Sequence, residues 1–454
     1  MDKSKSKIQN PKSKIQNRNV SPARIAVFEI LKKIETEKSF SSVLLPVYEE
    51  TLQTKDRSLC HELTLGTLRN QIYLDKVIEF LTGKNLERLD LAVILSLRIG
   101  LFQILFLDKV PSHAAINESV NLVYRAKKHS AGSFVNAVLR RATREKIELK
   151  FADELDKISV KTSHPRWLIE KWVEQFGFEE TKALTFSNNE SPSLVFRLTK
   201  KSDENTLSTL SQTGLEISQS KIVEDAWKIS KSNEILRLFA ETGKIYFQDE
   251  ASQLVGQIVD LQENEIFFDV CAAPGSKTTF INGKRKMENG KLFVAGDFHE
   301  HRLRSLRENC LRQGADNVKF VRYNAESSMP FAEPSFDVIL LDAPCSGTGT
   351  IRHNPEIRYF LQPKDFVELG KKQLNLLRNA SKLLREGGRL IYSTCSLERE
   401  ENETVVEYFL DADPNFRKVL PKVSERFLNG EGFARTFPNQ DNTDGFFIAV
   451  FEKG

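Results

Sequence analysis

Cysteine is scarce in this chain of 454 residues, and its distribution argues against a metal site. There are five cysteines, an odd number, and none forms a CxxC pair or a Cys/His cluster with the spacing of metal ligands. Zinc or another structural metal is therefore not expected. Three of them (Cys271, Cys345 and Cys395) follow predicted strands, which favours reduced thiols in a cytoplasmic protein.

Long apolar runs are also lacking. The most apolar segment, Leu91–Leu107, is interrupted by Arg98 and Gln103 and is short for a membrane span. A buried helix is expected there, and no membrane partner. The first twenty residues hold six Lys or Arg and no apolar run, so they are not a secretory signal. A repeated polar KSKIQN unit predicts a disordered basic tail over residues 1–20.

Charge of one sign does not dominate the composition either. The formal net charge is +4, so the total charge alone does not indicate a nucleic-acid partner. Residues 122–150, however, contain eight Lys or Arg against two Glu, a local net charge of +6. Such a run is either a solvated helix face or a surface that binds phosphates, and charge alone does not separate the two.

The length predicts two or three domains, because a single core rarely grows to this size. Residues 21–150 show helical spacing of apolar positions throughout, with Ser21 and Pro22 marking the first helix start. Residues 160–240 combine short strand and helix patterns in a small α/β module. Residues 241–454 alternate strand, loop and helix, which predicts a mostly parallel, doubly wound sheet.

In this last region the apolar and turn residues predict the order of elements. The expected strands are residues 266–270, 292–297, 318–323, 336–341 and 389–393. The expected helices lie near residues 299–313, 365–384 and 400–410. Gly387 and Gly388 are expected to stop the second of these helices. Ligands of such a sheet bind outside the carboxyl ends of its strands.

The loop after the first strand has the composition of a ligand-binding turn. Asp269–Thr278 (DVCAAPGSKT) contains successive small residues and precedes a predicted helix. Small residues let backbone amides approach a ligand, and a helix N-terminus favours a carboxylate or phosphate. Neither GxxxxGK[ST] nor GxGxxG is present, so the loop is neither a P-loop nor a dinucleotide fingerprint. A plain strand–helix turn is the alternative.

Polar residues also follow the next two strands. Asp297 ends the second strand at a place where the hydroxyls of a nucleoside ribose are commonly bound. Asn324 ends the third strand, where it could contact a base edge or only cap a turn.

Two thiols follow two further strands. Asp342–Gly349 (DAPCSGTG) contains Cys345, and Ser393–Ser396 (STCS) contains Cys395. Taken alone, Cys345 beside Asp342 would be the candidate nucleophile, although a buried cysteine is more often an inert small apolar residue. As a pair at the ends of two strands, the thiols favour a shared reactive cleft.

These motifs together resemble a known family. DVCAAPGSKT, DFHEHRL (297–303), DAPCSGTG, STCS and DGFF (444–447) occur in the order found in the Sun/Fmu-type, RsmB-like bacterial 16S rRNA cytosine-5 methyltransferases. Residues 248–252 (QDEAS) extend the resemblance upstream. The helical region resembles their NusB-like RNA-binding domain through Arg24, Asp56-Arg57, residues 66–69 and residues 134–141.

The resemblance implies a fold and an activity. The fold would be α/β, with a Rossmann-like S-adenosylmethionine (SAM) methyltransferase domain over residues 241–454. It would follow a NusB-like domain over residues 21–150 and the small module of residues 160–240. The activity would be methylation of cytosine carbon-5 in 16S rRNA by a cytoplasmic monomer, on an unstacked or single-stranded target.

The family mechanism assigns roles to both cysteines. Cys395 would attack carbon-6 of the cytosine, which makes carbon-5 able to accept a methyl group. Cys345 would assist release of the product, and Asp342 would bind the base near N3. The SAM site implied by the resemblance consists of Cys271, Ala272, Ala273, Pro274, Gly275, Ser276, Lys277, Asp297, Asn324 and Asp342.

Three positions depart from the family pattern. Ser276 replaces a glycine and should fit if that position needs no positive φ. Asn324 replaces an aspartate, and weaker SAM binding is expected because only an amide oxygen can still accept from the adenine amino group. The loop Arg352–Glu356 (RHNPE) differs from the usual Arg-Arg-His-Pro-Asp. Two rival functions remain at this point: the same chemistry on transfer RNA, and a non-catalytic RNA-binding or ribosome-assembly factor.

Overall fold

A computed structural model describes residues 20–284, 292–327 and 329–454. The described residues form two compact units, which divide between Ser163 and His164. The disordered tail predicted for residues 1–20 lies, except for residue 20, outside the described residues. In the described part of the chain, no helix is long and apolar enough to cross a membrane.

The described residues of the first unit form helices joined by loops, without strands, as the sequence predicted. Its α-helices are α1 (Pro22–Glu37), α2 (Ser41–Glu49), α3 (Thr54–Arg69), α4 (Gln71–Thr82), α5 (Leu91–Phe106), α6 (Ser112–Arg125), α7 (Gly132–Ala142) and α8 (Glu154–Thr162). The predicted buried helix is α5, whose residues from Val93 to Gln103 are almost all buried. Arg98 tolerates this burial because it forms ion pairs with Asp75 and Glu35 at 2.7 and 2.6 Å.

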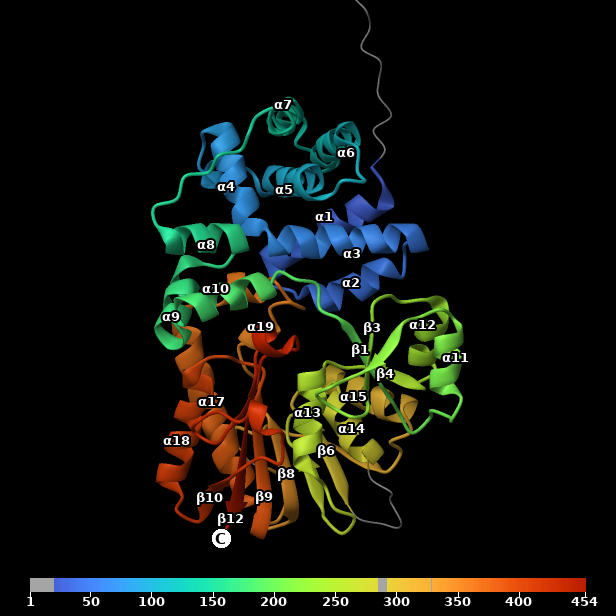
Figure 1. Ribbon diagram of the computed structural model, residues 1–454, viewed down its shortest axis with the longest axis vertical. Coiled ribbons are helices and arrows are strands. Elements are labelled where there is room, and N and C mark those ends of the chain that lie inside the picture. Colours follow the sequence, from blue (N-terminus) through green and yellow to red (C-terminus); the bar gives the residue numbers. More distant parts are fainter. Residues whose placement is uncertain (1–19, 285–291, 328) are drawn as a thin grey trace, which may run out of the picture. The chain divides into compact units, whose positions relative to one another are not determined.

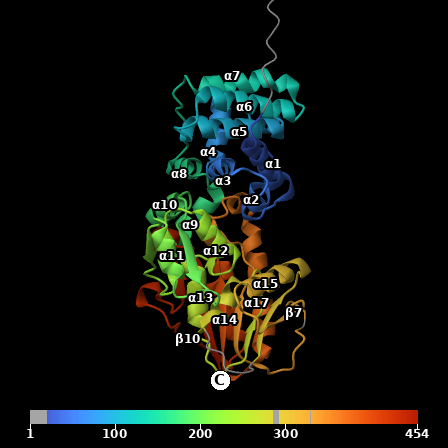
Figure 2. The ribbon, with the colours of Figure 1, turned by 90° about the vertical axis from the view of Figure 1, so that its right-hand side faces the viewer.

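The second unit begins with a small module. Its helices are α9 (Arg166–Phe176), α10 (Phe178–Ser187), α11 (Thr206–Gln212) and α12 (Glu234–Glu241). Its strands are β1 (Leu194–Leu198), β2 (Ile217–Gln219), β3 (Ala226–Ile229) and β4 (Ile245–Phe247), in the antiparallel order β2-β3-β1-β4. Leu210 of α11 and Leu236 of α12 pack with Phe196 of β1 in one small core. Figure 2 shows α11 and α12 in the same part of the second unit. The sheet includes β4, which follows the boundary predicted at residue 240.

The large sheet contains the predicted strands in a mostly parallel arrangement (Figure 1). They are β5 (Phe267–Asp269), β6 (Phe293–Asp297), β7 (Val318–Arg322), β8 (Phe336–Asp342) and β9 (Leu384–Thr394), in the parallel order β9-β8-β5-β6-β7. Three antiparallel strands that the sequence did not predict extend it beyond β9: β10 (Phe416–Val419), β11 (Ala434–Thr436) and β12 (Phe446–Lys453). The chain reverses its direction of travel across the sheet between β5 and β8, a topological switch point.

Helices cover both faces of this sheet, which explains why its strands are apolar without alternation. On one face Phe267, Val338 and Ile391 pack with α13 (Glu250–Val259), α14 (Ser276–Lys284) and α15 (Glu300–Arg312). On the other face Phe268 and Ile339 pack with α17 (Pro363–Lys382) and α18 (Glu403–Ala412).

One predicted helix end is wrong. α17 ends at Lys382 rather than at the glycine pair, and Gly387 and Gly388 lie inside β9. Gly387 has a φ of 71°, and a Cβ on Gly388 would lie 2.9 Å from the carbonyl oxygen of Asp337. The glycines are needed for the irregular start of β9 beside β8, so they mark a strand rather than a helix stop.

Arg197 of β1 joins the small module to the large sheet. Its side chain is 2% exposed and donates to Gln248 Oε1 (2.8 Å) and to Thr279 Oγ1 (2.7 Å). It also donates to the carbonyl oxygen of Ser276 at 3.2 Å, and so contacts the loop that opens α14. Burial lowers the pKa of Arg197 to about 10, which leaves the guanidinium charged at neutral pH.

Arg197→Lys should destabilise the second unit, because an ammonium cannot reproduce the planar fork that serves several buried acceptors. We expect a loss of about 2–4 kcal/mol in the free energy of unfolding. Tryptophan fluorescence is a suitable probe, since the three tryptophans (Trp167, Trp172 and Trp227) lie in this unit. Arg417→Lys is the control: Arg417 is exposed and pairs with Glu452 at 3.0 Å, so it should cost less than about 1 kcal/mol. Equal losses in the two variants would contradict the role of Arg197.

Candidate active site

The register between β8 and β9 brings the two cysteine loops together. Asp342 lies directly opposite Ser393, and the amide of Ala343 donates to the carbonyl oxygen of Ser393 at 2.8 Å. Both strands end here, and each continues into its cysteine-containing loop. The amide of Gly349 donates to the carbonyl oxygen of Cys395 at 2.9 Å, which ties the loops again.

The two predicted thiols are in contact. Cys345 Sγ and Cys395 Sγ lie 3.2 Å apart, and both side chains are partly buried. The hydrogen bond to Cys395, together with burial, raises the pKa of the Cys345 thiol well above its usual range. Negative charge on Glu401 and Asp342 acts in the same direction. This environment therefore favours the protonated form of Cys345.

Asp342 points at the same place from the end of β8. Its Oδ2 accepts from Lys277 Nζ at 2.7 Å and its Oδ1 from the hydroxyl of Ser393 at 2.8 Å. Burial would lower the pKa of Lys277, but the ion pair with Asp342 outweighs it and raises this pKa. The acid of one strand thus holds the lysine of the first loop beside the thiols.

The first loop makes a tight turn from β5 into α14. Gly275 has a φ of 103°, whereas Ser276 is the first residue of α14, so the positive φ falls on the glycine and the serine fits. Asp269 is buried; its Oδ2 accepts from the Thr278 hydroxyl at 2.7 Å, and its Oδ1 has no partner among the described residues. Burial raises the pKa of Asp269 to about 7.

Asp297 stands at the end of β6, as predicted. Its Oδ1 accepts from the amide of His299 at 3.0 Å, and its Oδ2 lies 3.7 Å from the guanidinium of Arg302. Arg302 also donates to the carbonyl oxygen of Ala273 at 2.7 Å. The second strand end and the first loop are therefore connected through one arginine.

Asn324 uses its amide oxygen within its own turn. Oδ1 accepts from the amide of Glu326 at 3.0 Å, which is the turn-capping alternative considered for this residue. Because the acceptor is engaged there, the other end of the side chain is the donating Nδ2. The amide oxygen that was expected to accept from the adenine amino group is thus already bonded within the turn.

A cavity of about 620 Å³ joins most of the predicted positions. Its predicted lining residues are Cys271, Ala273, Asp297, Asn324, Asp342, Cys345 and Cys395. An adjoining cavity of about 100 Å³ is lined by Asp269, Cys271, Ala272, Ala273, Pro274, Ser276, Lys277 and Asp342. Residues predicted from five separate segments therefore surround two cavities that share Cys271, Ala273 and Asp342.

The sequence did not single out several other lining residues. Arg302, Tyr323, Lys372 and Leu376 also line the larger cavity. Arg302 had a usable signal, because it follows Asp297 in the first turn of a predicted helix. Lys372 and Leu376 had none, since they belong to the middle of α17 and approach the cavity only when that helix packs on the sheet.

One group of acidic and histidine side chains lies outside this cavity. Ligand atoms of Asp249, His353 and Asp444 all lie within 4.8 Å of one another. Asp249 already accepts from the Thr443 hydroxyl at 2.6 Å, and the cationic Arg352 lies 3.7 Å from Asp444. These partners disfavour a metal ion at the cluster, and the absence of a metal site stays a prediction.

Comparison with protein families matches three segments of the chain. Residues 256–452 match the model of the 16S rRNA methyltransferase RsmB/F family. Residues 21–144 match the NusB family, and residues 164–235 match the ferredoxin-like domain of RsmF/B-like methyltransferases.

Curated relatives match over nearly the whole chain. The probable ribosomal RNA small subunit methyltransferase B of Bacillus subtilis is 33% identical over 443 residues, which are 95% of this chain and 98% of the relative. The ribosomal RNA small subunit methyltransferase B of Pseudomonas putida is 33% identical over 436 residues, again 95% and 98%. The chain belongs to this methyltransferase B family. It is therefore an enzyme, a methyltransferase that uses SAM.

Solved structures agree with this fold. The crystal structure of PH0851 is 28% identical, covers 96% of this chain and 99% of its own, and superposes with a TM-score of 0.83. A methyltransferase homologue from Pyrococcus horikoshii is 26% identical with a TM-score of 0.56, covering 67% of this chain and 100% of its own.

Proposed function

We propose that this enzyme methylates carbon-5 of a cytosine in 16S ribosomal RNA through a covalent cysteine–cytosine intermediate, in the cytoplasm. The observation that carries the proposal is the pair of thiols, 3.2 Å apart, beside Asp342 in one cavity. Carbon-5 of cytosine is a weak nucleophile until a thiolate adds to carbon-6, so a thiol is what this reaction requires. The names of the curated relatives support small-subunit ribosomal RNA as the substrate.

Cys395 is the nucleophile in this proposal. The raised pKa of Cys345 favours its protonated form in the free enzyme, and this thiol can donate a hydrogen bond to a Cys395 thiolate. The thiolate then adds to carbon-6, which breaks the conjugation of the ring and makes carbon-5 nucleophilic. SAM supplies the methyl group that carbon-5 accepts.

Cys345 completes the reaction. Once Cys395 is bonded to carbon-6 it carries no negative charge, and the principal cause of the raised pKa of Cys345 disappears. Cys345 can then lose its proton to solvent and take the proton from carbon-5. The electron pair of that C–H bond reforms the ring double bond and expels Cys395 as a thiolate.

Asp342 would bind the target base, and Lys277 would keep its carboxylate in place. We place Asp342 against the cytosine edge near N3, where the ring takes on charge, and the salt bridge with Lys277 keeps this carboxylate oriented. The target must be unstacked to reach the part-buried thiols, so a single-stranded or remodelled RNA segment fits the site.

The remaining lining residues suit SAM by their chemistry. A Cβ on Gly275 would lie 2.7 Å from Leu306, and Gly275 has a φ of 103°, so the tight turn between the lining residues Pro274 and Ser276 requires a glycine. Asp297 offers a carboxylate for the ribose hydroxyls, and the unpartnered Oδ1 of Asp269 offers a further acceptor. Asn324 would present only its Nδ2 to the adenine, because its Oδ1 is engaged within the turn.

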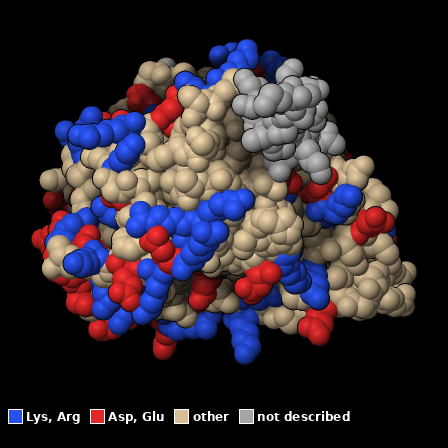
Figure 3. Space-filling model, turned by 90° about the horizontal axis from the view of Figure 1, so that it is seen from above, with Lys and Arg blue, Asp and Glu red and all other residues tan. Residues whose placement is uncertain are grey.

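The helical unit, proposed over residues 21–150, would bind RNA through its phosphates. Lys and Arg side chains are prominent on the face shown in Figure 3, with Asp and Glu among them. In the basic run, Lys128 pairs with Asp90 and Arg141 with Glu145, both at 2.6 Å, which reduces the effective charge. Lys32, Arg125 and Lys127 line a cavity of about 540 Å³ in the same unit, and this is the surface we favour.

The substrate and the chemistry can be tested together. With SAM and small-subunit ribosomal RNA containing 5-fluorocytosine, the protein should form a covalent adduct, because fluorine at carbon-5 blocks the release step. Transfer RNA treated in the same way should form none. Mapping 5-methylcytosine in ribosomal RNA from a strain lacking the protein should show one site lost. An adduct with transfer RNA alone would show that transfer RNA, not ribosomal RNA, is the substrate. No adduct with either RNA would favour a non-catalytic RNA-binding factor.

The roles of the two cysteines predict opposite behaviour of their variants. Cys395→Ala should form no adduct and should lose methylation by at least about 1,000-fold, because covalent activation of carbon-5 is lost. Cys345→Ala should form an adduct with ordinary cytosine that persists, because release is blocked. Denaturing electrophoresis of protein and labelled RNA measures both. The reverse pattern would show that the roles are exchanged.

Asn324→Asp should bind SAM more tightly than the natural chain. One carboxylate oxygen would keep the hydrogen bond from the Glu326 amide, and the second would accept from the adenine amino group. We expect the dissociation constant to fall about tenfold, measured by calorimetry without RNA. Asn429→Asp is the matched control: its Oδ1 accepts from the amides of Glu431 and Phe433 in another turn, and its affinity for SAM should not change. Weaker binding by Asn324→Asp would contradict this prediction and show that the Nδ2 donor is the group that the adenine requires.

A further inference from the structure

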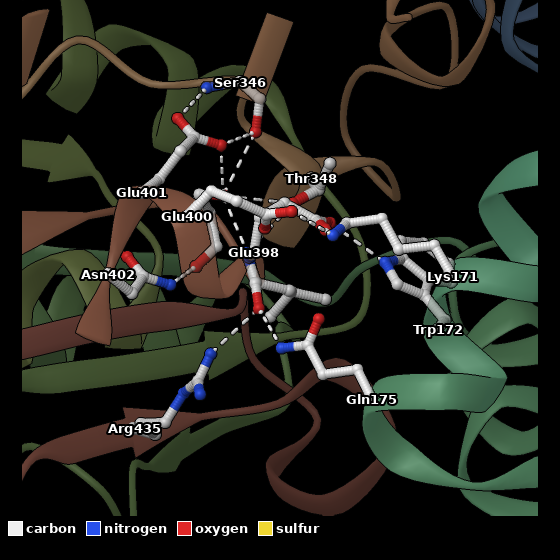
Figure 4. A network of polar contacts seen from close by, with 12 residues as sticks. Lys171, Trp172, Gln175, Ser346, Thr348, Glu398, Glu400, Glu401, Asn402 and Arg435 are labelled. Carbon is white, nitrogen blue, oxygen red and sulfur yellow. Dashed lines mark hydrogen bonds and ion pairs between the residues drawn. The ribbon is translucent and has the colours of Figure 1, made fainter. Parts of the chain in front are cut away.

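A buried carboxylate lies behind the two thiols and contacts both of their loops. Glu401 belongs to the 3-10 turn Arg399–Glu401 that follows Cys395, and it is 0% exposed. Its Oε2 accepts from the amide of Ser346 at 2.9 Å, and its Oε1 accepts from the Ser346 hydroxyl and from the Ser396 hydroxyl at 2.6 Å. Figure 4 shows Ser346 directing both groups at this carboxylate.

These serines are the neighbours of the thiols in the chain. Ser346 follows Cys345 directly, and Ser396 follows Cys395. The two hydroxyl oxygens also lie 3.1 Å apart, so one carboxylate oxygen gathers both loops at a single point. The contact therefore limits how far the thiols can separate.

A third element is held by the same carboxylate. Gln373 of α17 donates through Nε2 to Glu401 Oε2 at 2.9 Å and to the carbonyl oxygen of Pro344 at 3.0 Å. Pro344 immediately precedes Cys345, so the Cys345 loop is held on both sides of the thiol. Burial raises the pKa of Glu401, whereas the serine and glutamine donors favour its ionised form.

The turn that carries Glu401 is itself held from outside. Trp172 of α9 donates to Glu398 at 2.9 Å, and Gln175 donates to the carbonyl oxygen of Leu397 at 3.0 Å. Arg435 donates to the same carbonyl at 3.0 Å (Figure 4). Because the turn is anchored on two sides, Glu401 can act as a fixed point for the loops.

We propose that Glu401 is a positioning residue that holds the Cys345 and Cys395 loops together and so sets the distance between the two thiols. It touches neither thiol, and it does not line the cavity described above. The effect of Glu401 on catalysis rests on the proposed function. Its effect on the distance between the two thiols does not.

Two substitutions separate geometry from charge. Glu401→Gln should be tolerated: its amide oxygen can accept from the Ser346 amide and from Gln373, while its NH₂ donates to the serine hydroxyls, which rotate to accept. Glu401→Ala removes every contact. Glu403→Gln is the matched control, because Glu403 is buried in the same segment and pairs with Arg435 at 2.6 Å.

The distance between the thiols can be measured without RNA. Diamide removes one hydrogen from each of two neighbouring thiols and is reduced to its hydrazine, which leaves a disulfide. Mass spectrometry of the full chain should show a Cys345–Cys395 disulfide forming rapidly in the natural protein, in Glu401→Gln and in Glu403→Gln. In Glu401→Ala the rate of disulfide formation should fall at least about tenfold, because the two sulfur atoms are no longer held at reacting distance. An unchanged rate in a folded Glu401→Ala protein would overturn the proposal.

The catalytic consequence has its own measurement. The rate of adduct formation with RNA containing 5-fluorocytosine should fall on the order of 100-fold in Glu401→Ala and less than about threefold in Glu401→Gln. If the natural protein forms no adduct, the proposed function fails while the disulfide rates still test Glu401. If Glu401→Ala does not fold, Ser396→Ala removes one arm of the contact, and it should slow disulfide formation by roughly threefold or more. No slowing in that variant would also overturn the proposal.

Discussion

The parallel pairing of β8 with β9 decides where both thiols lie, and the rest of the site depends on it. Asp342 and Ser393 face each other at the last paired positions, so the two loops leave the sheet side by side. A slip of one residue would turn every side chain of one strand to the opposite face. Both faces of these strands are buried under helices, which specifies the register strongly and makes the 3.2 Å contact between Cys345 and Cys395 reproducible.

A part-buried acid, Asp342, and a buried one, Asp269, lie at this edge of the sheet, and each accepts hydrogen bonds. Asp342 is held by Lys277 and Ser393, whereas Asp269 has the Thr278 hydroxyl and one oxygen without a partner among the described residues. Burying a carboxylate costs free energy unless hydrogen bonds compensate it. The burial of Asp269, whose pKa is raised to about 7, is the least compensated by hydrogen bonds. This suits a carboxylate that binds a ligand. The same carboxylates thus take part in the hydrogen bonding of the fold and in the proposed binding of ligands.

The small module does more than connect the two larger parts of the chain. Through Arg197 of β1 it contacts Ser276 at the first turn of α14, and through Trp172 of α9 it holds Glu398 after Cys395. It therefore supports the cofactor loop and the loop of the proposed nucleophile at once. Precise placement of reacting groups requires such rigid support, since displacements of about 1 Å are enough to slow catalysis strongly.

By itself the sequence determined the succession of the parallel strands along the chain, the helical character of the first unit and the segments that meet at the cavity. These follow from local causes: apolar runs, turn residues and motifs that each lie within ten residues. The end of α17 was misjudged because Gly387 and Gly388 serve the start of β9, and their role depends on the carbonyl of Asp337 from β8. Only the tertiary structure decided that the Asn324 Oδ1 accepts a hydrogen bond within its own turn and that Lys372 lines the cavity. It also decided that Glu401 contacts Ser346, 55 residues away in the chain, and so joins the two cysteine loops. Such contacts join residues distant in sequence, so no local pattern encodes them.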